Sequence, residues 1–226
     1  MMTFEKEKQS GSSMVEMLGY LAIFVLLAGM VYIGYAAANR RIKIDRTVNA
    51  VNDVIQDVRT GFGAKRFYSV LGGGADFVDS LIQNDIVSAK LCINLNCTDK
   101  TKKSSCTCSD KADGVSVLTH PLGGRMKIIL VDPVPGLTNS YRQFAVELLD
   151  IDEKTCFPLV SQNWNGSGET VNVIESLAID DNPKYTDAGG NEKSGFTKFP
   201  VNLGDAKTLC GKNESAGNHK LTFTVR

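Results

Sequence analysis

The residue whose chemistry most needs an explanation is Glu16, a carboxylate at the start of a long apolar run. Residues 17–38, MLGYLAIFVLLAGMVYIGYAAA, contain no charged and no strongly polar side chain. A carboxylate at bilayer depth costs about 3 kcal/mol or more unless a cation lies beside it. Lys6 and Lys8 lie in a polar segment upstream, so neither provides that cation. Glu16 therefore either marks the head-group boundary or awaits a positive charge from elsewhere.

A cut between Gly11 and Ser12 would create such a charge. The new α-amino group on Ser12 would lie four residues from Glu16, which is about one helical turn. The amine of a neighbouring subunit would serve equally well. The spacing thus indicates a carboxylate–ammonium pair that forms only after processing.

Six cysteines are the second set of residues that could do chemistry, and their number favours an oxidising compartment. Four of them occur close together in CINLNCTDKTKKSSCTC. Their C-x4-C and C-x-C spacings differ from the C-x2-C knuckles of most structural zinc sites. We therefore expect two local disulfides whose pairing is open, with zinc as the alternative, among Cys92, Cys97, Cys106 and Cys108.

The sequence offers little other chemistry. His120 and His219 are far apart and have no motif around them, so surface or packing roles are expected. No Ser/His/Asp or Cys/His arrangement stands out, and we predict no enzyme activity, no catalytic residue, no metal and no cofactor. Lysine plus arginine and aspartate plus glutamate both total 25, so bulk charge gives no reason to expect nucleic-acid binding.

A membrane helix must position Glu16. At about 1.5 Å per residue the 22 residues of 17–38 extend roughly 33 Å, which crosses a hydrocarbon core of about 30 Å. The apolar region of a secretory signal peptide is only about 7–15 residues long. We therefore predict a retained transmembrane segment at 17–38 within an N-terminal helix at 12–60.

The second part of that helix is amphipathic, because apolar residues follow at intervals of three and four. No proline or glycine occurs from Asn39 to Thr60, whereas Gly61 and Gly63 provide a stop. The stripe predicts packing against the following domain. Its members are Ile44, Val48, Val51, Ile55 and Val58.

The remaining residues, 61–226, read as a globular α+β head. Residues 76–87 have helical spacing, and four segments have the β-branched or aromatic character of strands. The fold class predicted is α+β, with a long N-terminal α-helix packed on an antiparallel β-sheet. The predicted strands are residues 124–132, 141–149, 169–176 and 220–226.

The N-terminal residues carry a resemblance. SG followed by SSMVEMLGYLAIFVLLAG resembles the class III signal of type IV pilins: a short polar leader, 1–11, then Glu as the fifth residue of the mature chain and an apolar run. The resemblance implies cleavage after Gly11 by a prepilin peptidase and methylation of the Ser12 amine. It also implies that Glu16 pairs with the terminal amine of an adjacent subunit during assembly. Ser rather than Phe at position 12 is similar to the type IVb group.

The head resembles type IVb pilins more loosely, in a Gly-Gly step before one strand and a cysteine-bearing helix after the next. That resemblance implies a C-terminal disulfide between Cys156 and Cys210. A plain positive-inside count of Arg40, Arg41, Lys43 and Arg46 would place the head in the cytoplasm. The cysteines of the head favour the periplasm instead.

The resemblance implies a structural subunit of a type IV pilus, or fimbrium. It would wait in the bacterial inner membrane as a single-pass protein with a periplasmic head and then join an extracellular filament. Its partners would be membrane lipid, prepilin peptidase, the pilus assembly machinery and other copies of itself in a helical filament. One alternative is a minor pilin or a type II secretion pseudopilin. The other is an uncleaved, membrane-anchored periplasmic binding or thiol protein.

Overall fold

Helix α1 (Ser12–Phe62) is the longest element of the chain, and 51 residues form it without a proline. The computed structural model describes residues 12–70, 76–98, 106–164, 173–182, 184–186, 192–211 and 218–226. The chain divides into two units, residues 1–42 and 43–226. Helix α1 ends two residues beyond the expected Thr60, where the amide of Gly63 donates to the carbonyl of Thr60 and that of Lys65 to Phe62.

The second part of α1 belongs to the core of unit 43–226. Val51, Ile55 and Val58 are fully buried, and Ile44 is nearly so, as the three- and four-residue spacing predicted. Val48 is half-buried and packs on the same cluster. Thr47 and Val54 are also buried, and the Thr47 hydroxyl donates to the carbonyl of Lys43 at 2.9 Å. The buried face of this part of α1 is therefore wider than the predicted stripe.

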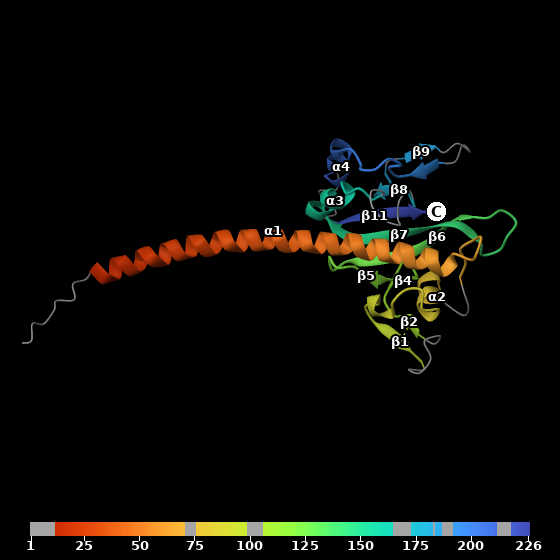
Figure 1. The fold of residues 1–226 in the computed structure, drawn as a ribbon, viewed down its shortest axis with the longest axis horizontal. Coiled ribbons are helices and arrows are strands. Elements are labelled where there is room, and N and C mark those ends of the chain that lie inside the picture. The colour runs from red at the N-terminus through yellow and green to blue at the C-terminus, as the bar shows by residue number, and fades with distance from the viewer. Residues whose placement is uncertain are drawn as a thin grey trace, which may run out of the picture. The chain divides into compact units, whose positions relative to one another are not determined.

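A five-stranded antiparallel sheet lies behind this part of α1 (Figure 1). The predicted strands at 124–132, 141–149 and 220–226 are confirmed with small shifts in their ends. The fourth, β8 (Ile174–Ile179), extends three residues beyond its predicted end, and residues 169–172 of the prediction lie outside the described residues. The strand order is β5 (Leu118–Thr119), β6 (Arg125–Pro133), β7 (Tyr141–Asp152), β11 (Asn218–Val225) and β8 (Ile174–Ile179).

The two faces of the sheet differ in character because side chains alternate along each strand. On β7, Phe144, Val146 and Leu148 occupy one face and are fully buried in the core cluster that includes the α1 stripe. The opposite face carries Glu147, whose cross-strand neighbours in register are Lys127 and Thr222. The Nζ of Lys127 lies 3.5 Å from Oε2 of Glu147, so two nearly buried charges neutralise each other there.

Gly123 and Gly124, which precede β6, are needed for two different reasons. Gly123 has φ +92°, a conformation that L side chains rarely adopt. At Gly124 a Cβ atom would lie only 2.5 Å from both Nε2 of His120 and the carbonyl oxygen of Leu149. The Gly-Gly step thus allows β6 to start close against the chain around His120.

Helix α2 (Phe77–Gln83) is shorter than the helical spacing of 76–87 predicted. Asp85 has φ +57°, so the chain leaves the helical conformation there, and Asn84 caps the carboxyl end.

The other helices are α3 (Glu153–Val160), α4 (Leu203–Cys210) and the short 3-10 helix η1 (Ala89–Leu91). Three small two-stranded sheets complete the described fold: β1 (Leu95–Cys97) with β2 (Cys106–Cys108), β3 (Lys111–Ala112) with β4 (Val115–Ser116), and β9 (Lys184–Thr186) with β10 (Glu192–Ser194).

Candidate assembly helix and disulfide-linked head

Glu16 lies in the first turns of α1 and is exposed. The hydroxyl of Tyr20 donates to Oε1 of Glu16 at 3.4 Å, which is a weak contact across one helical turn. Sequence reasoning missed Tyr20, although its spacing of four residues was a usable signal. Ser12 begins α1, four residues or about 6 Å of helical rise before Glu16, whereas Gly11 lies outside the described residues. The geometry therefore places a carboxylate within reach of the first turn of the helix.

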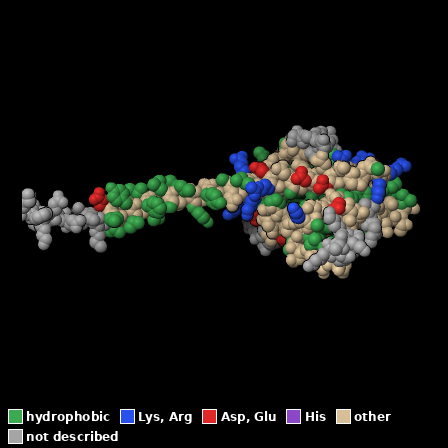
Figure 2. Space-filling model, turned by 60° about the horizontal axis from the view of Figure 1, so that its bottom comes forward, with side chains coloured by type: hydrophobic (Ala, Val, Ile, Leu, Met, Phe, Trp, Pro, Cys, Tyr) green, Lys and Arg blue, Asp and Glu red, His purple; other side chains and the backbone are tan. Residues whose placement is uncertain are grey.

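The apolar half of α1, which we define as residues 17–38, has no core of its own. Its large side chains are all more than half exposed, from 56% at Ile23 to 73% at Tyr32. Figure 2 shows hydrophobic side chains along the visible face of this part of the helix. In the part of the chain that the structure describes, α1 is the one helix long and apolar enough to cross a membrane. Lipid or other protein must cover such a surface, because it is apolar on every side.

A cluster of exposed basic side chains follows the apolar half directly. It consists of Arg40, Arg41, Lys43 and Arg46, all on the surface of α1. Positive side chains at the end of an apolar span suit a head-group layer or acidic protein groups. The change from apolar to basic within three residues marks where the non-aqueous environment of α1 would end.

Cys156 and Cys210 are joined by a disulfide, the pair that the resemblance implies. The bond connects α3 to α4 across 54 residues of sequence, and both cysteines are buried in the core cluster. In the same core cluster the indole of Trp164 donates to the carbonyl of Leu159 at 2.9 Å and packs on Phe223. The bond thus fixes α4 to α3, which itself packs on strands β7 and β11.

The other four cysteines form two nested disulfides, Cys92–Cys108 and Cys97–Cys106. Cys97 and Cys106 are directly opposite each other in the β1–β2 ladder. All four sulfur atoms are therefore in S–S bonds and none is a thiolate ligand, so the zinc alternative does not describe this structure.

Two aspartates at the start of α2 hold neighbouring segments: Asp79 holds the disulfide-linked hairpin, and Asp76 holds strand β4. Oδ1 of Asp79 accepts from the amide of Cys108 at 2.9 Å, and Oδ2 of Asp76 accepts from the amide of Ser116 at 2.8 Å. Burial raises the pKa of Asp79 above its usual value, whereas the bond from Cys108 lowers it. Sequence reasoning missed both residues, although an Asp preceding a helix, such as Asp76, is a capping signal.

His120 and His219 are both buried and do not pair with each other. Nε2 of His120 lies 3.1 Å from the carbonyl oxygen of Leu149, and Nδ1 of His219 lies 2.7 Å from Oδ2 of Asp180. Burial lowers the pKa of His120, and the contact with Leu149 raises it by less. The expectation of packing roles describes both residues better than a surface role.

No family model and no curated protein matches the chain. Several solved structures do, among them three pilin structures. The crystal structure of a type IVb pilin from Salmonella typhi is 15% identical, with a TM-score of 0.46, over 78% of this chain and 95% of that one. TcpA, a type IV pilin from Vibrio cholerae El Tor biotype, is also 15% identical, with a TM-score of 0.44, over 81% and 99%. The solution structure of the Salmonella typhi type IVb pilin PilS is 15% identical, with a TM-score of 0.39, and the match covers 78% of this chain and 93% of that one.

Proposed function

We propose that this chain is a structural subunit of a type IV pilus, of the type IVb kind. In this proposal a prepilin peptidase cuts after Gly11, the new amine of Ser12 is methylated, and the subunit polymerises through the apolar half of α1. The observation that carries the proposal is that residues 17–38 are apolar all round and that their large side chains are more than half exposed, with Glu16 directly at their start.

Hydrophobic burial would supply the driving force for both membrane residence and assembly. A fully buried large apolar side chain contributes about 1.5–3 kcal/mol relative to an exposed one. The apolar half has more than ten such side chains, among them Leu26, Leu27 and Phe24, so lipid can hold the subunit before assembly. Other copies of the same helix would then replace lipid around it in the filament.

Glu16 would set the axial register between neighbouring helices. A carboxylate and an ammonium group about 4 Å apart attract each other by about 4 kcal/mol at an effective dielectric of 20. Desolvation opposes that attraction, so the pair selects one register more than it adds stability. The hydrogen bond from the Tyr20 hydroxyl to Glu16, at 3.4 Å, is too long and too weak to replace the interaction with an ammonium group.

The proposed location follows from the disulfides. Three bonds engage all six cysteines, which suits a head that folds in the periplasm and is later exposed outside the cell. The subunit would therefore be a single-pass protein of the bacterial inner membrane until the assembly machinery extracts it. The same bonds count against the alternative of a working thiol protein, because no described cysteine is free.

A minor pilin or a type II secretion pseudopilin would share the N-terminal features. The abundance of the protein in sheared filaments distinguishes these roles from that of a major subunit. A major subunit should be the most abundant protein in filaments sheared from the cell surface. A minor subunit should be a small fraction of the sheared material, and a pseudopilin should be absent from it.

Intact-mass measurement of the membrane-extracted protein tests processing. We expect a chain of 215 residues that begins at Ser12, eleven fewer than the 226 of the full sequence, with the mass of one added methyl group. A full-length product, or a product cut elsewhere, would contradict the proposal.

The Glu16→Gln variant tests assembly, because it removes the charge and keeps the size. We expect the ratio of sheared filament to membrane-held subunit to fall at least tenfold, while the head stays folded. Tyr20→Phe is the matched control, since it removes only the hydroxyl that contacts Glu16, and it should assemble as well as the parent. Normal polymerisation of Glu16→Gln would show that Glu16 is only a boundary residue.

A further inference from the structure

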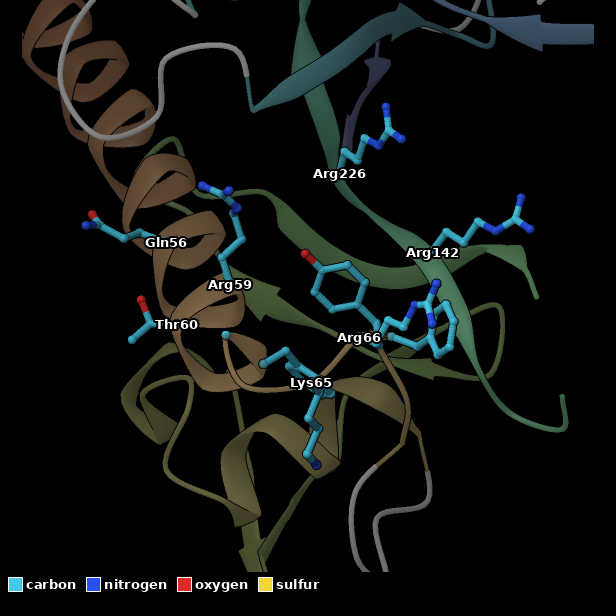
Figure 3. A pocket seen from close by; sticks show the side chains of 11 residues that line it. Gln56, Arg59, Thr60, Lys65, Arg66, Arg142 and Arg226 are labelled. Carbon is cyan, nitrogen blue, oxygen red and sulfur yellow. The ribbon is translucent and has the colours of Figure 1, made fainter.

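A basic cavity of about 620 Å³ opens at the carboxyl end of α1, within unit 43–226 (Figure 3). The end of the helix forms one wall, and the segment that follows it, residues 63–68, forms the floor. The start of β7 and the residue after β11 approach from the other side, through Arg142 and Arg226. Segments far apart in the sequence therefore meet around one hollow, which no local motif revealed.

The described side chains that line this basic cavity include five cations and no carboxylate. The chain as a whole has equal numbers of acidic and basic residues, so this is a local excess of positive charge. Like charges held around one hollow repel each other, and an anion inside it would remove that repulsion. The five cations are Arg59, Lys65, Arg66, Arg142 and Arg226.

Within the part of the chain that the structure describes, the contacts of three of these cations are with aromatic rings and with one exposed carboxylate. Arg66 stacks over the ring of Phe67 at 5.7 Å and Lys65 over Phe62 at 5.3 Å, and neither ring supplies a full negative charge. Nη1 of Arg142 lies 3.9 Å from Oδ2 of Asp132, in a pair exposed to solvent. Exposed pairs of that length contribute little.

Arg59 and Tyr68 add directional donors to the basic cavity. Arg59 lies close to the hydroxyl of Tyr68. Burial raises the pKa of Tyr68 above its usual value, while Arg59 lowers it by less, so the hydroxyl stays protonated at neutral pH. The ring of Tyr68 is fixed by packing on Phe62 and Phe144, with centroids 5.4 and 5.0 Å away. The hydroxyl is therefore held in place and keeps a proton to donate.

We propose that the basic cavity binds a phosphate or sulfate ester carried on a small organic group such as a sugar. Guanidinium groups present a planar fork of N–H donors that matches the oxygens of these anions. Thr60 and Gln56 also line the hollow and bring further polar atoms. Its volume lies in the range of small-molecule sites, roughly 300–1,000 Å³, and leaves room for an organic group beside the aromatic rings.

Isothermal titration of the full chain in polyoxyethylene detergent micelles tests the proposal, with glucose 6-phosphate, glucose 6-sulfate and glucose as probes. We expect saturable binding of at least one ester, weakening as salt is added, and no binding of glucose. Binding of only one ester would support the site and identify its anion. Failure of both esters to bind the folded chain at millimolar concentration would overturn the proposal.

Variants locate the binding. Arg66→Gln combined with Arg142→Gln removes two exposed cations from the basic cavity and should weaken ester binding at least tenfold. Lys207→Gln removes one exposed cation from α4, outside the cavity, and should change the affinity less than twofold. Equal weakening by Lys207→Gln would show that general charge and not the cavity binds the ester. If the double variant does not fold, Arg66→Gln alone decides, with at least threefold weakening expected.

This inference does not rest on the proposed role in a filament. Ester binding is measured on the dispersed subunit, and assembly is measured on intact cells. A chain that polymerises and binds neither ester would remove only the ligand proposal. A chain that binds an ester and is never processed would remove only the filament proposal.

Discussion

The two halves of α1 have the same backbone conformation and opposite surfaces. In the apolar half every large side chain is exposed, whereas the half from Lys43 buries one face in the core and leaves charged residues outside. A stripe of apolar side chains can be covered by the chain's own sheet. A helix that is apolar on all sides needs cover from lipid or from other molecules. The pattern of side chains, and not helix propensity, therefore decides which half belongs to the folded head.

The largest difference between the halves should come from shortening one buried and one exposed side chain. Ile55 is 0% exposed, and Ile55→Ala should lower the free energy of unfolding of the head by about 2–5 kcal/mol, since it removes core contacts and leaves a cavity. Leu27 is 57% exposed, and Leu27→Ala should leave that free energy unchanged. Denaturant titration followed by Trp164 fluorescence measures both, because Trp164 is the only tryptophan and is buried in the head. Equal losses would show that the apolar half also contributes to the fold of the head.

The disulfides test how stability is distributed inside the head. Replacing Cys156 and Cys210 by Ser opens a loop of 54 residues and should cost about 4 kcal/mol in the chain-entropy model. Replacing Cys97 and Cys106 opens a loop of only nine residues and should cost about 2.5 kcal/mol in the same model. Calorimetry of the two double variants measures the difference. Neither change should alter retention in the membrane, which the apolar half determines.

Glycine substitutions distinguish the two halves at a smaller scale. Gly124→Ala should destabilise the head by about 1–3 kcal/mol, because its Cβ would lie 2.5 Å from His120 and from the Leu149 carbonyl. Gly29→Ala, in the apolar half of α1, has no atom within 4 Å of the new Cβ and should leave the head unchanged. Thermal melts of the head provide the measurement. An unchanged melt for Gly124→Ala would mean that the start of β6 can move away from His120.

The smallest effect concerns pH. The pKa of His120 is lowered in the folded head from its ordinary value of 6.5. Below pH 6.5, His120 of the unfolded chain therefore takes up a proton while His120 of the folded head stays neutral. His120 should therefore reduce stability progressively as pH falls from 6.5 toward the folded pKa, and have no effect above 6.5. Denaturant titrations of the parent and His120→Gln between pH 7.5 and 5.5 measure the difference in slope. Identical slopes would show that His120 titrates alike in both states.

Local patterns predicted the parts of the fold that local physics determines. The spacing of Val51, Ile55 and Val58 predicted the buried stripe, and the composition of residues 124–132 and 141–149 predicted β6 and β7. Residue spacing overestimated the length of α2, because it gives no sign of the left-handed conformation of Asp85 that follows the helix. The pairing of four neighbouring cysteines depends on strand register, which spacing alone leaves open.

The candidate sites were less predictable for the same reason. Glu16 was evident, since one charge beside an apolar run is a local feature. The basic cavity was missed, because Arg59, Arg142 and Arg226 meet only after β7 and β11 have paired. Equal totals of acidic and basic residues conceal such a local excess. Net charge therefore excludes attraction over the whole surface and says nothing about a single hollow.

The β1–β2 hairpin also bears on how reliably the head reaches the correct covalent form. Six cysteines allow fifteen fully bonded pairings, and random oxidation would produce mostly wrong isomers. The register that pairs Leu95 with Cys108 and Asn96 with Thr107 also sets Cys97 opposite Cys106. Cys92 and Cys108 can then close around the finished rung, which leaves Cys156 with one partner, Cys210. The hairpin thus acts as a template, and each correct bond lowers the number of errors still available to the chain.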